Sequence, residues 1–288
     1  MLKAKISDYL ELTKPRVTFM VLVSVLAGFY LGVGDSINWI LLFNAMLGTW
    51  LVAGGTNALN QLIERDIDSV MKRTQKRPLP SGRLTAKQVG IFATSISVIG
   101  ISYLCVTANL LTGFLAALTL ISYVFVYTPL KRKTSLSTII GAVPGALPAM
   151  GGWAAVTGEI GGGAWALFFI LFFWQLPHFL AIAWIYKEDY ERGGFPVLPV
   201  IDVDGDLTGR QIIINCLALI SVSLLPTILG LTGAVYFVGA LVLGLLYLAS
   251  GIRLARQKSN RCAKQLLHAS IIYLPLLLTL MFIDKTGL

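Results

Sequence analysis

Charged residues are scarce in this chain. Asp, Glu, Lys and Arg make up 13% of its 288 residues, whereas an ordinary soluble domain carries roughly 25%. Hydrophobic side chains reach 56% of the sequence, and the mean hydropathy is +0.77. A single soluble core could not bury this much apolar surface. The composition therefore excludes a soluble globular protein and predicts a chain that crosses a membrane several times.

Cysteine is also rare. The three cysteines, Cys105, Cys216 and Cys262, are odd in number, far apart and not arranged in a metal-ligand spacing. The sequence therefore predicts neither a disulfide framework nor a zinc site.

The start of the sequence does not show the pattern of a cleavable leader. The first apolar run begins near Val17, after the charged residues Asp8, Glu11, Lys14 and Arg16, and no small-residue cleavage site follows it. We expect this run to be retained as the first membrane span. No Arg- and Ser-rich presequence precedes it, which favours a bacterial membrane over a mitochondrial one.

Long apolar runs are what the sequence has in abundance. Runs of about 18 to 24 residues match a hydrocarbon layer about 30 Å thick. They predict an all-α, polytopic protein with about nine transmembrane helices, forming one integral-membrane domain over residues 1–288. The predicted spans cover 17–34, 38–62, 88–107, 110–128, 136–157, 164–186, 211–230, 233–251 and 267–283.

Basic residues test this topology, because Lys and Arg accumulate in short cytoplasmic loops. With nine spans, 22 of the 23 basic residues fall on one side and only Lys285 falls on the other. We therefore predict a cytoplasmic N-terminus and an external C-terminus. The topology explains the net charge of +9 without a nucleic-acid partner. Chemistry on soluble phosphorylated substrates is expected in the two longest cytoplasmic loops, at about 60–87 and 186–210.

The first of these loops carries an acidic stripe. If the second span continues past the membrane surface, Asn60, Glu64 and Asp68 lie four residues apart and spread over only about 80° of the helix. Asp66 projects elsewhere. Oxygen ligands in this arrangement suit Mg²⁺, which is shared between carboxylates and substrate phosphates. The alternative is a set of solvated charges paired by helical spacing.

Basic residues follow the stripe directly. Arg73, Lys76 and Arg77 are predicted to make charge-assisted contacts to the phosphates of such a substrate. The first loop thus combines candidate metal ligands with candidate phosphate ligands.

Several segments together resemble a known family. The pattern Asn60-x-x-x-Glu64-x-x-x-Asp68 at the end of the second of nine helices is similar to the first signature of the UbiA-type intramembrane prenyltransferases, with Glu in place of the first Asp. Other segments resemble the protoheme IX farnesyltransferase, or haem O synthase, branch of that family. These are Leu12-Thr-Lys-Pro-Arg-Val17, Arg65-Asp-Ile-Asp68 with Met71 and Arg73-Thr74, Arg77-Pro-Leu-Pro80, Tyr127-Thr-Pro-Leu-Lys-Arg132, Trp174-Gln-Leu-Pro-His-Phe179 and Pro196-Val-Leu-Pro-Val200.

The resemblance implies a helical bundle around a central cavity and a defined reaction. The farnesyl group of farnesyl diphosphate would pass to the 2-vinyl group of haem b, with addition of water, giving haem O and diphosphate. Mg²⁺ would be the cofactor, membrane lipid the surroundings, and a haem A synthase or terminal oxidase the receiver of the product. The resemblance also adds Lys131 and Arg132 to the diphosphate ligands.

In the second loop the resemblance is incomplete. The wider family carries a second Asp-x-x-x-Asp here, but in this chain Asp189 is followed four residues later by Gly193. The family pattern implies catalytic roles for Lys187 and Asp189, with Asp189 as a further metal ligand. It leaves open whether this loop binds its own Mg²⁺ or only contacts diphosphate and metal-bound water.

His178 is one of only two histidines and lies in the middle of a span. Ionisable residues inside a membrane are often functional. Three roles are open: an axial ligand of haem iron, proton handling near the acceptor vinyl group, and a hydrogen-bonded structural histidine. The neighbouring Trp174 and Gln175 are candidate haem contacts in the same segment.

Three other functions compete with this interpretation. A related prenyltransferase could act on a quinone precursor such as 4-hydroxybenzoate, a transporter could use polar groups within its helices, and a non-catalytic haem carrier could use His178. Phosphate-type residues gathered in two loops on one side favour a one-sided active site over alternating access. A carrier leaves the acidic stripe without a role.

Overall fold

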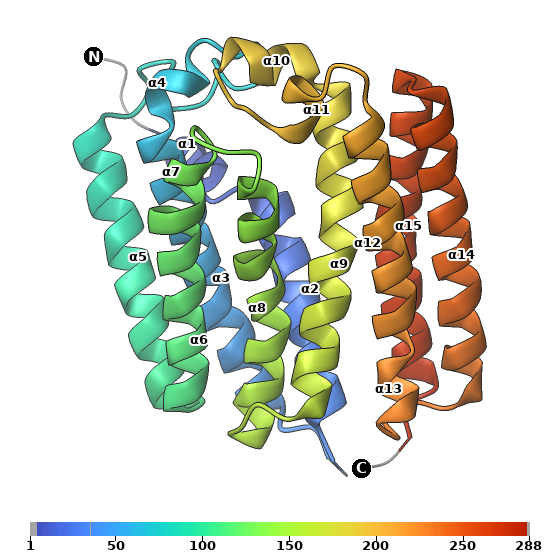
Figure 1. Cartoon of the computed structure of the whole chain (residues 1–288). Helices are drawn as coiled ribbons and strands as arrows, with labels where there is room; N and C mark the ends of the chain where they lie inside the picture. The colour runs from blue at the N-terminus through green and yellow to red at the C-terminus, as the bar shows by residue number, and fades with distance from the viewer. Residues whose placement is uncertain (1–4, 35, 287–288) are drawn as a thin grey trace.

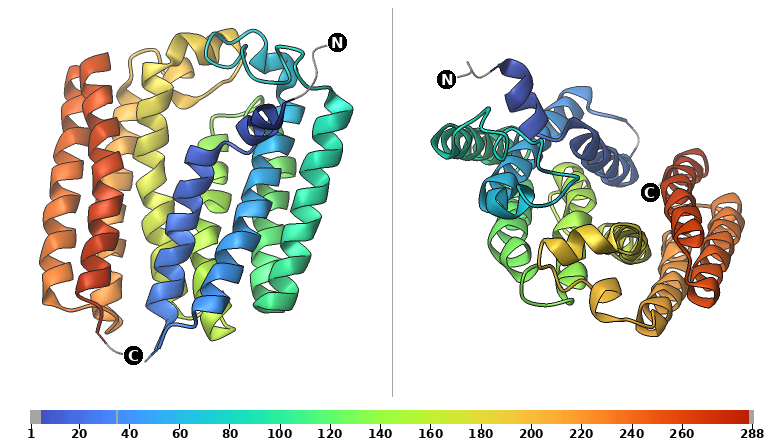
Figure 2. Two further views of the ribbon diagram at one scale, coloured as in Figure 1. Left: turned by 180° about the vertical axis from the view of Figure 1, so that it is seen from behind. Right: turned by 90° about the horizontal axis from the view of Figure 1, so that it is seen from above.

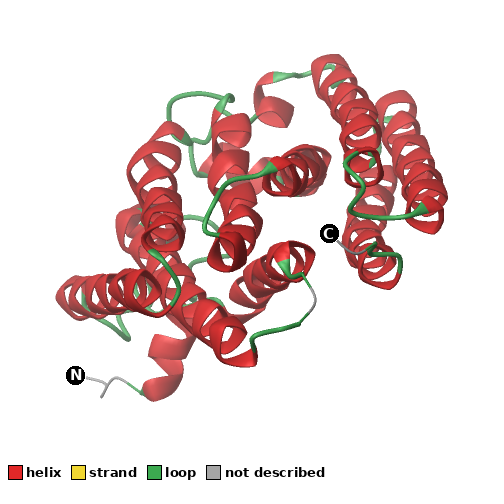
Figure 3. Ribbon diagram, turned by 90° about the horizontal axis from the view of Figure 1, so that it is seen from below, coloured by secondary structure: helices red, strands yellow, loops and turns green. Residues whose placement is uncertain are grey.

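The computed structural model describes residues 5–34 and 36–286, and these residues are almost entirely helical. Within that part of the chain there is no β-strand, only one isolated bridge between Thr232 and Lys285. The all-α prediction is therefore confirmed. Seen from the end opposite the long loops, the helices stand next to one another as a bundle (Figure 3).

Nine helices in the described residues are long and apolar enough to cross a membrane, as predicted. They are α2 (Pro15–Gly32), α3 (Trp39–Ile63), α5 (Ala86–Thr107), α6 (Leu110–Ile121) continued by the π-helix η1 (Ser122–Tyr127) and α7 (Thr128–Leu130), α8 (Ser137–Thr157), α9 (Gly162–Ile185), α12 (Asp206–Ser223) continued by α13 (Leu225–Ile228), α14 (Ala234–Gln257) and α15 (Asn260–Ile283).

The last two spans are longer than predicted. Helix α14 continues past residue 251 to Gln257, and α15 begins at Asn260 instead of near residue 267. Hydropathy ends at Arg253 and resumes after Lys264, but long basic side chains can extend from a helix to the water at the membrane boundary. The Ser259 hydroxyl also accepts a hydrogen bond from the Cys262 N–H and so caps the early start of α15.

Helix α9 joins two groups of helices. It packs against α8 on one side and against α12 and α15 on the other, and in Figure 1 it stands between the green and orange helices. The first and last spans, α2 and α15, meet near the end of the bundle where the C-terminus lies. There the Tyr30 hydroxyl donates to the Phe282 carbonyl at 3.3 Å, and Lys285 Nζ donates to the Tyr30 carbonyl at 2.8 Å.

Four short helices lie together at the other end of the bundle (Figures 1 and 2). They are α1 (Ile6–Leu12), α4 (Arg65–Asp68), α10 (Lys187–Arg192) and α11 (Leu198–Ile201). The two predicted loops, 60–87 and 186–210, meet at this end. Among the described basic residues, Lys285 alone belongs to the opposite end, as the charge pattern predicts.

Close packing of α2 against α8 depends on glycines. A Cβ atom at Gly28 would lie 1.8 Å from the Ala149 carbonyl oxygen, and one at Gly152 would lie 2.1 Å from the Val25 carbonyl oxygen. Both contacts are with backbone, which cannot move aside locally. Small residues let two helix backbones approach each other in a membrane, where packing rather than hydrophobic burial drives association.

The packing predicts a contrast between two adjacent glycines of α8. Gly152→Ala should lower the free energy of unfolding by about 1–3 kcal/mol, because the new methyl group forces α2 and α8 apart. Gly151→Ala is the matched control, since a Cβ at Gly151 meets no atom within 4 Å. Thermal unfolding of both variants in the same detergent checks this. Equal unfolding temperatures for the two variants would contradict the packing argument.

Candidate active site

A polar cavity of about 100 Å³ lies at the end of the bundle that carries the short helices. Four stretches of the chain contribute to it: the start of α2, the end of α3 with the following loop, the η1–α8 connection and the α10–α11 region. The lining residues are Lys14, Asn60, Glu64, Asp68, Met71, Arg73, Thr74, Arg77, Tyr123, Lys131, Tyr190 and Phe195.

The predicted stripe lies on one side of this cavity. Helix α3 ends at Ile63 and α4 begins at Arg65, but the helical bonds continue across the junction. The Glu64 N–H donates to the Asn60 carbonyl at 3.0 Å, and the Asp68 N–H donates to the Glu64 carbonyl at 2.8 Å. Asn60, Glu64 and Asp68 are all buried and share the cavity, which confirms their common face.

Asp66 points out of the site, as its position on the helix predicts. Its side chain is 86% exposed and pairs with Arg65 at 3.4 Å. It therefore offers a chemically matched carboxylate outside the cavity.

Both buried carboxylates are held by basic residues. Lys131 Nζ donates to Glu64 Oε1 at 2.8 Å, and Arg77 Nη1 donates to Asp68 Oδ2 at 2.6 Å. Lys14 Nζ donates to Asn60 Oδ1 at 3.3 Å. Four basic residues line the cavity against two acidic ones. The excess positive charge favours a polyanionic ligand.

The basic side chains respond differently to burial. The pKa of Lys14 falls to about 7, because burial disfavours the ammonium form and the nearby Arg77 repels it. Burial also acts to lower the pKa of Lys131, but Tyr127 and the carboxylate of Glu64 outweigh it, and the pKa lies above its ordinary value. An anion entering the cavity would favour the charged form of both lysines.

The donor set fits a hard cation only if a substrate completes it. No group of three or more His, Cys, Asp and Glu side chains able to hold a metal occurs in residues 5–34 and 36–286. Glu64 and Asp68 supply two carboxylates, and Asn60 supplies an amide oxygen. Mg²⁺ commonly binds through one or two carboxylates together with substrate phosphates and water. The residues present therefore fit Mg²⁺ that is also coordinated by a phosphorylated ligand.

The π-helix η1 contributes Tyr123 to the lining of the cavity. In η1 the Thr128 N–H bonds to the Tyr123 carbonyl, five residues back. The Thr128 hydroxyl donates to that same carbonyl at 2.9 Å and accepts from Asn60 Nδ2 at 3.2 Å. Single π-turns inside helices are frequent at functional sites, and this one joins α3 to the segment that carries Lys131.

Sequence patterns assign no site role to several lining residues: Lys14, Met71, Thr74, Tyr190 and Phe195. Lys14 could have been found, because a lysine directly before Pro15 at the start of a span lies at the membrane boundary. Phe195 lies beneath Lys131, with the ammonium 5.0 Å from its ring centre. That contact joins residues far apart in the chain, so no local pattern reports it.

The predicted diphosphate ligands separate into two groups. Arg73, Arg77 and Lys131 line the cavity, and the Arg73 guanidinium also lies 5.2 Å from the ring centre of Tyr186. Lys76 and Arg132 are exposed and do not line it. The structure therefore brings three of the five predicted basic residues together.

Lys187 and Asp189 lie in a different place from the stripe. Both line a second, more open cavity of about 510 Å³, beside Trp184 and Asn260. Asp189 is buried and pairs with Arg192. These two side chains therefore line a different cavity from Asn60, Glu64 and Asp68, and Asp189 does not form a group of three metal-binding carboxylates with Glu64 and Asp68.

The predicted haem contacts on α9 also lie outside the first cavity. His178 Nδ1 is 2.7 Å from Ser270 Oγ of α15, and Trp174 Nε1 donates to the Ser270 carbonyl at 2.9 Å. The Trp174 and His178 rings are stacked, with centres 5.2 Å apart. Gln175 instead turns toward α8 and donates to the Ala142 and Leu171 carbonyls, so the structure separates it from His178.

Solved structures share this fold over nearly the whole chain. One, described as "Structural and mechanistic insights into the biosynthesis of Digeranylgeranylglyceryl phosphate synthase in membranes", aligns with a TM-score of 0.82 at 16% identity and covers 97% of this chain and 98% of that one. A UbiA homolog from Archaeoglobus fulgidus bound to GPP and Mg²⁺ aligns with a TM-score of 0.63 at 15% identity, covering 95% and 99%. At these identities the likeness concerns the fold.

Sequence relatives are much closer. A protoheme IX farnesyltransferase of Solibacter usitatus is 48% identical and covers 98% of this chain and 99% of its own length. The protein of the same name from Salinibacter ruber is 44% identical and covers 96% and 98%. The model of the UbiA prenyltransferase family matches residues 21–273. The chain therefore belongs to the UbiA prenyltransferase family and, within it, to the protoheme IX farnesyltransferases.

Proposed function

We propose that this protein transfers the farnesyl group of farnesyl diphosphate to the 2-vinyl group of protohaem IX (haem b), with addition of water, giving haem O and diphosphate. The name of the relatives, protoheme IX farnesyltransferase, indicates the acceptor and the transferred group. The observation that carries the proposal is the polar cavity that four basic residues line together with two carboxylates and an amide. That combination suits a diphosphate bound together with a divalent cation.

The basic residues would bind the diphosphate by exchange of partners. Arg77 and Lys131 now neutralise Asp68 and Glu64. A diphosphate entering the cavity offers stronger acceptors to both bases and leaves the two carboxylates available. Lys14 and Arg73 complete the phosphate side of the site. Lys76 and Arg132, which are exposed, have no part in this proposal.

Asn60, Glu64 and Asp68 would hold Mg²⁺ against the diphosphate. When bound, the cation would offset negative charge that develops on the leaving group. Asp189 and Lys187 are left out of this set because they line the second cavity. The family's second acidic motif is reduced in this chain, and its position in the structure agrees with a single carboxylate cluster for metal binding.

The chain's own residues would then favour bond cleavage. The allylic carbon–oxygen bond breaks and its electron pair leaves with the diphosphate, while the π electrons of the vinyl group form the new carbon–carbon bond. Water adds to the resulting cation and gives up a proton. Tyr123, Tyr190 and Phe195 line the cavity, and aromatic ring faces stabilise a nearby cation. No enzyme nucleophile is needed.

His178 is our candidate ligand for haem iron. The Ser270 hydroxyl donates to the Leu267 carbonyl at 2.6 Å, so its one hydrogen is used there. His178 Nδ1 then carries the proton and donates to Ser270 Oγ, and Nε2 keeps its lone pair. A neutral imidazole with one nitrogen anchored is the usual form of a metal-binding histidine. The same bonds would also satisfy a structural histidine, which a haem spectrum distinguishes.

The protein would work in one membrane with its active site on one side. The basic end of the bundle carries the cavity, so we propose that this end faces the cytoplasm of a bacterial cell. The whole chain forms one catalytic domain in this proposal. Haem O, which stays in the membrane, would pass to a terminal oxidase or to a haem A synthase.

Removal of one carboxylate tests the metal and diphosphate assignment. Asp68→Asn should lower turnover by about 100-fold or more, because the site loses a metal ligand that acts on the leaving group. The assay incubates protein in lipid with haem b, farnesyl diphosphate and Mg²⁺, and follows by mass spectrometry the gain of one farnesyl plus one hydroxyl group. EDTA should abolish the gain in the unaltered protein.

Asp66→Asn is the matched control, since it removes the same charge two residues away at an exposed position. It should keep nearly full activity. Turnover by Asp68→Asn close to that of Asp66→Asn would overturn the assignment. Diphosphate release without a change in haem mass would instead indicate another acceptor, such as a quinone precursor, and no release at all would indicate a carrier or transporter.

The haem ligand is tested by spectroscopy. His178→Ala should shift the Soret band of haem bound to the protein and raise the KM for haem by about tenfold, because an axial bond to iron is lost. The KM for farnesyl diphosphate should stay unchanged, since His178 lies outside the first cavity. His268→Ala, at the other, exposed histidine, is the control. An unaltered haem spectrum in folded His178→Ala would assign the residue a structural role.

A further inference from the structure

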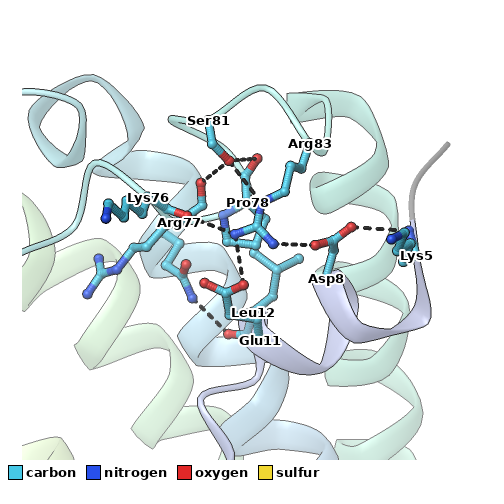
Figure 4. Close-up of polar contacts among 10 residues, drawn as sticks. Lys5, Asp8, Glu11, Leu12, Lys76, Arg77, Pro78, Ser81 and Arg83 are labelled. Atoms are coloured by element: carbon cyan, nitrogen blue, oxygen red, sulfur yellow. Dashed lines mark hydrogen bonds and ion pairs between the residues drawn. The ribbon is translucent and has the colours of Figure 1, made fainter. Parts of the chain in front are cut away.

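Arg83 ties the loop after α4 to the N-terminal helix α1 (Figure 4). All three nitrogens of its guanidinium group have partners. Nε donates to Ser81 Oγ at 3.0 Å, Nη1 pairs with Asp8 Oδ1, and Nη2 donates to Glu11 Oε2 and to the Lys76 carbonyl, both at 2.8 Å. A planar guanidinium can hold this many acceptors in a fixed arrangement, which a lysine ammonium cannot.

These bonds converge on the backbone of Arg77. The Lys76 carbonyl belongs to the peptide group before Arg77 and accepts directly from Arg83. The Arg77 carbonyl accepts from Ser81 Oγ at 2.7 Å, and that hydroxyl is itself held by Arg83 Nε. The peptide groups on both sides of Arg77 are therefore fixed by one side chain. This matters because residues 69–85 contain turns and bends but no regular helix.

Helix α1 provides the anchor for this arrangement. Asp8 and Glu11 are three residues apart and so lie on one face of α1. Leu12 is fully buried against Ala58 and Leu84, and its carbonyl accepts from Gln61 Nε2 at 2.9 Å. The carboxylates that hold Arg83 are thus mounted on a helix that is fastened to α3. Arg83 connects this fixed helix to a loop that has no regular helix of its own.

We infer that Arg83 is a positioning residue for diphosphate binding, acting through Arg77. Arg83 does not line the cavity, whereas Arg77 does and reaches Asp68 there at 2.6 Å. With both flanking peptide groups fixed, the Arg77 side chain leaves the loop at a defined point and direction. The inference rests on the proposed function, in which Arg77 binds the diphosphate.

Substitution of Arg83 should therefore affect one substrate. Arg83→Gln should raise the KM for farnesyl diphosphate by about tenfold, while kcat and the KM for haem change by less than about twofold. Arg83→Lys keeps the charge but not the fork of donors, and should recover only part of the loss. Arg65→Gln is the matched control, because Arg65 lies at the same end of the bundle and pairs with the exposed Asp66. It should leave all three constants unchanged.

The Arg77→Gln background separates positioning from general stability. If Arg83 acts through Arg77, Arg83→Gln should add less than about a twofold effect once Arg77 is replaced. The same tenfold effect in both backgrounds, or an equal loss for both substrates, would overturn the inference. So would an unchanged KM in folded Arg83→Gln. Should Arg83→Gln fail to fold, Arg83→Lys carries the same comparison.

Binding measurements test the role of Arg83 independently of whether the protein modifies haem. Calorimetric titration with farnesyl diphosphate should show about tenfold weaker binding by Arg83→Gln than by the unaltered protein. If the unaltered protein binds farnesyl diphosphate but leaves haem unmodified, the proposed function fails and the affinity comparison still decides the role of Arg83. Equal affinities in the two proteins would overturn the role of Arg83 alone.

Discussion

The proposed chemistry of this protein depends on two ion pairs at the end of the bundle. Glu64 with Lys131, and Asp68 with Arg77, neutralise carboxylates that would otherwise be buried alone, a situation that costs about 3–5 kcal/mol when one partner is removed. Yet the cavity holds two further bases, Lys14 and Arg73. The ion pairs therefore neutralise both carboxylates, and the cavity still carries a positive excess. In the proposed function, a diphosphate would bind the bases and a cation would bind the carboxylates, and the ion pairs hold both sets of side chains in the cavity beforehand.

The ion pairs can form only because distant helices approach closely. Lys131 directly follows α7, which continues the π-helix η1, whereas Glu64 directly follows α3. The Thr128 hydroxyl and Asn60 link these two parts of the chain. Small residues bring the neighbouring backbones together, as Gly28 and Gly152 do between α2 and α8. The surface elements then complete the site, with Arg83 joining α1 to the loop that carries Arg77. Spanning helices thus set the depth of the cavity, and the surface elements set the direction of its bases.

The two groups of candidate substrate contacts lie in different parts of the structure. The diphosphate residues gather around the ends of α3 and η1, while His178 and Trp174 face Ser270 of α15. This separation suits a reaction between one water-soluble headgroup and one large acceptor held in the membrane. Gln175 lies near Trp174 and His178 in the sequence but packs against α8 instead. A Cβ on Gly145 of α8 would lie 1.9 Å from Gln175 Oε1, so this side chain fills the contact between α8 and α9.

The sequence alone determined the elements that depend on local patterns. Hydropathy predicts the nine spans, the basic residues predict which ends lie together, and a spacing of four predicts the common face of Asn60, Glu64 and Asp68. Tertiary structure decided what depends on contacts across the chain: the partners Lys131 and Arg77, the contribution of Lys14 and Phe195, and the placement of Lys187 and Asp189 in a separate cavity. Helical periodicity predicts only which residues share one face of a single helix. The orientation of α10 relative to α3 depends on tertiary packing, here of α10 against α9 and α11.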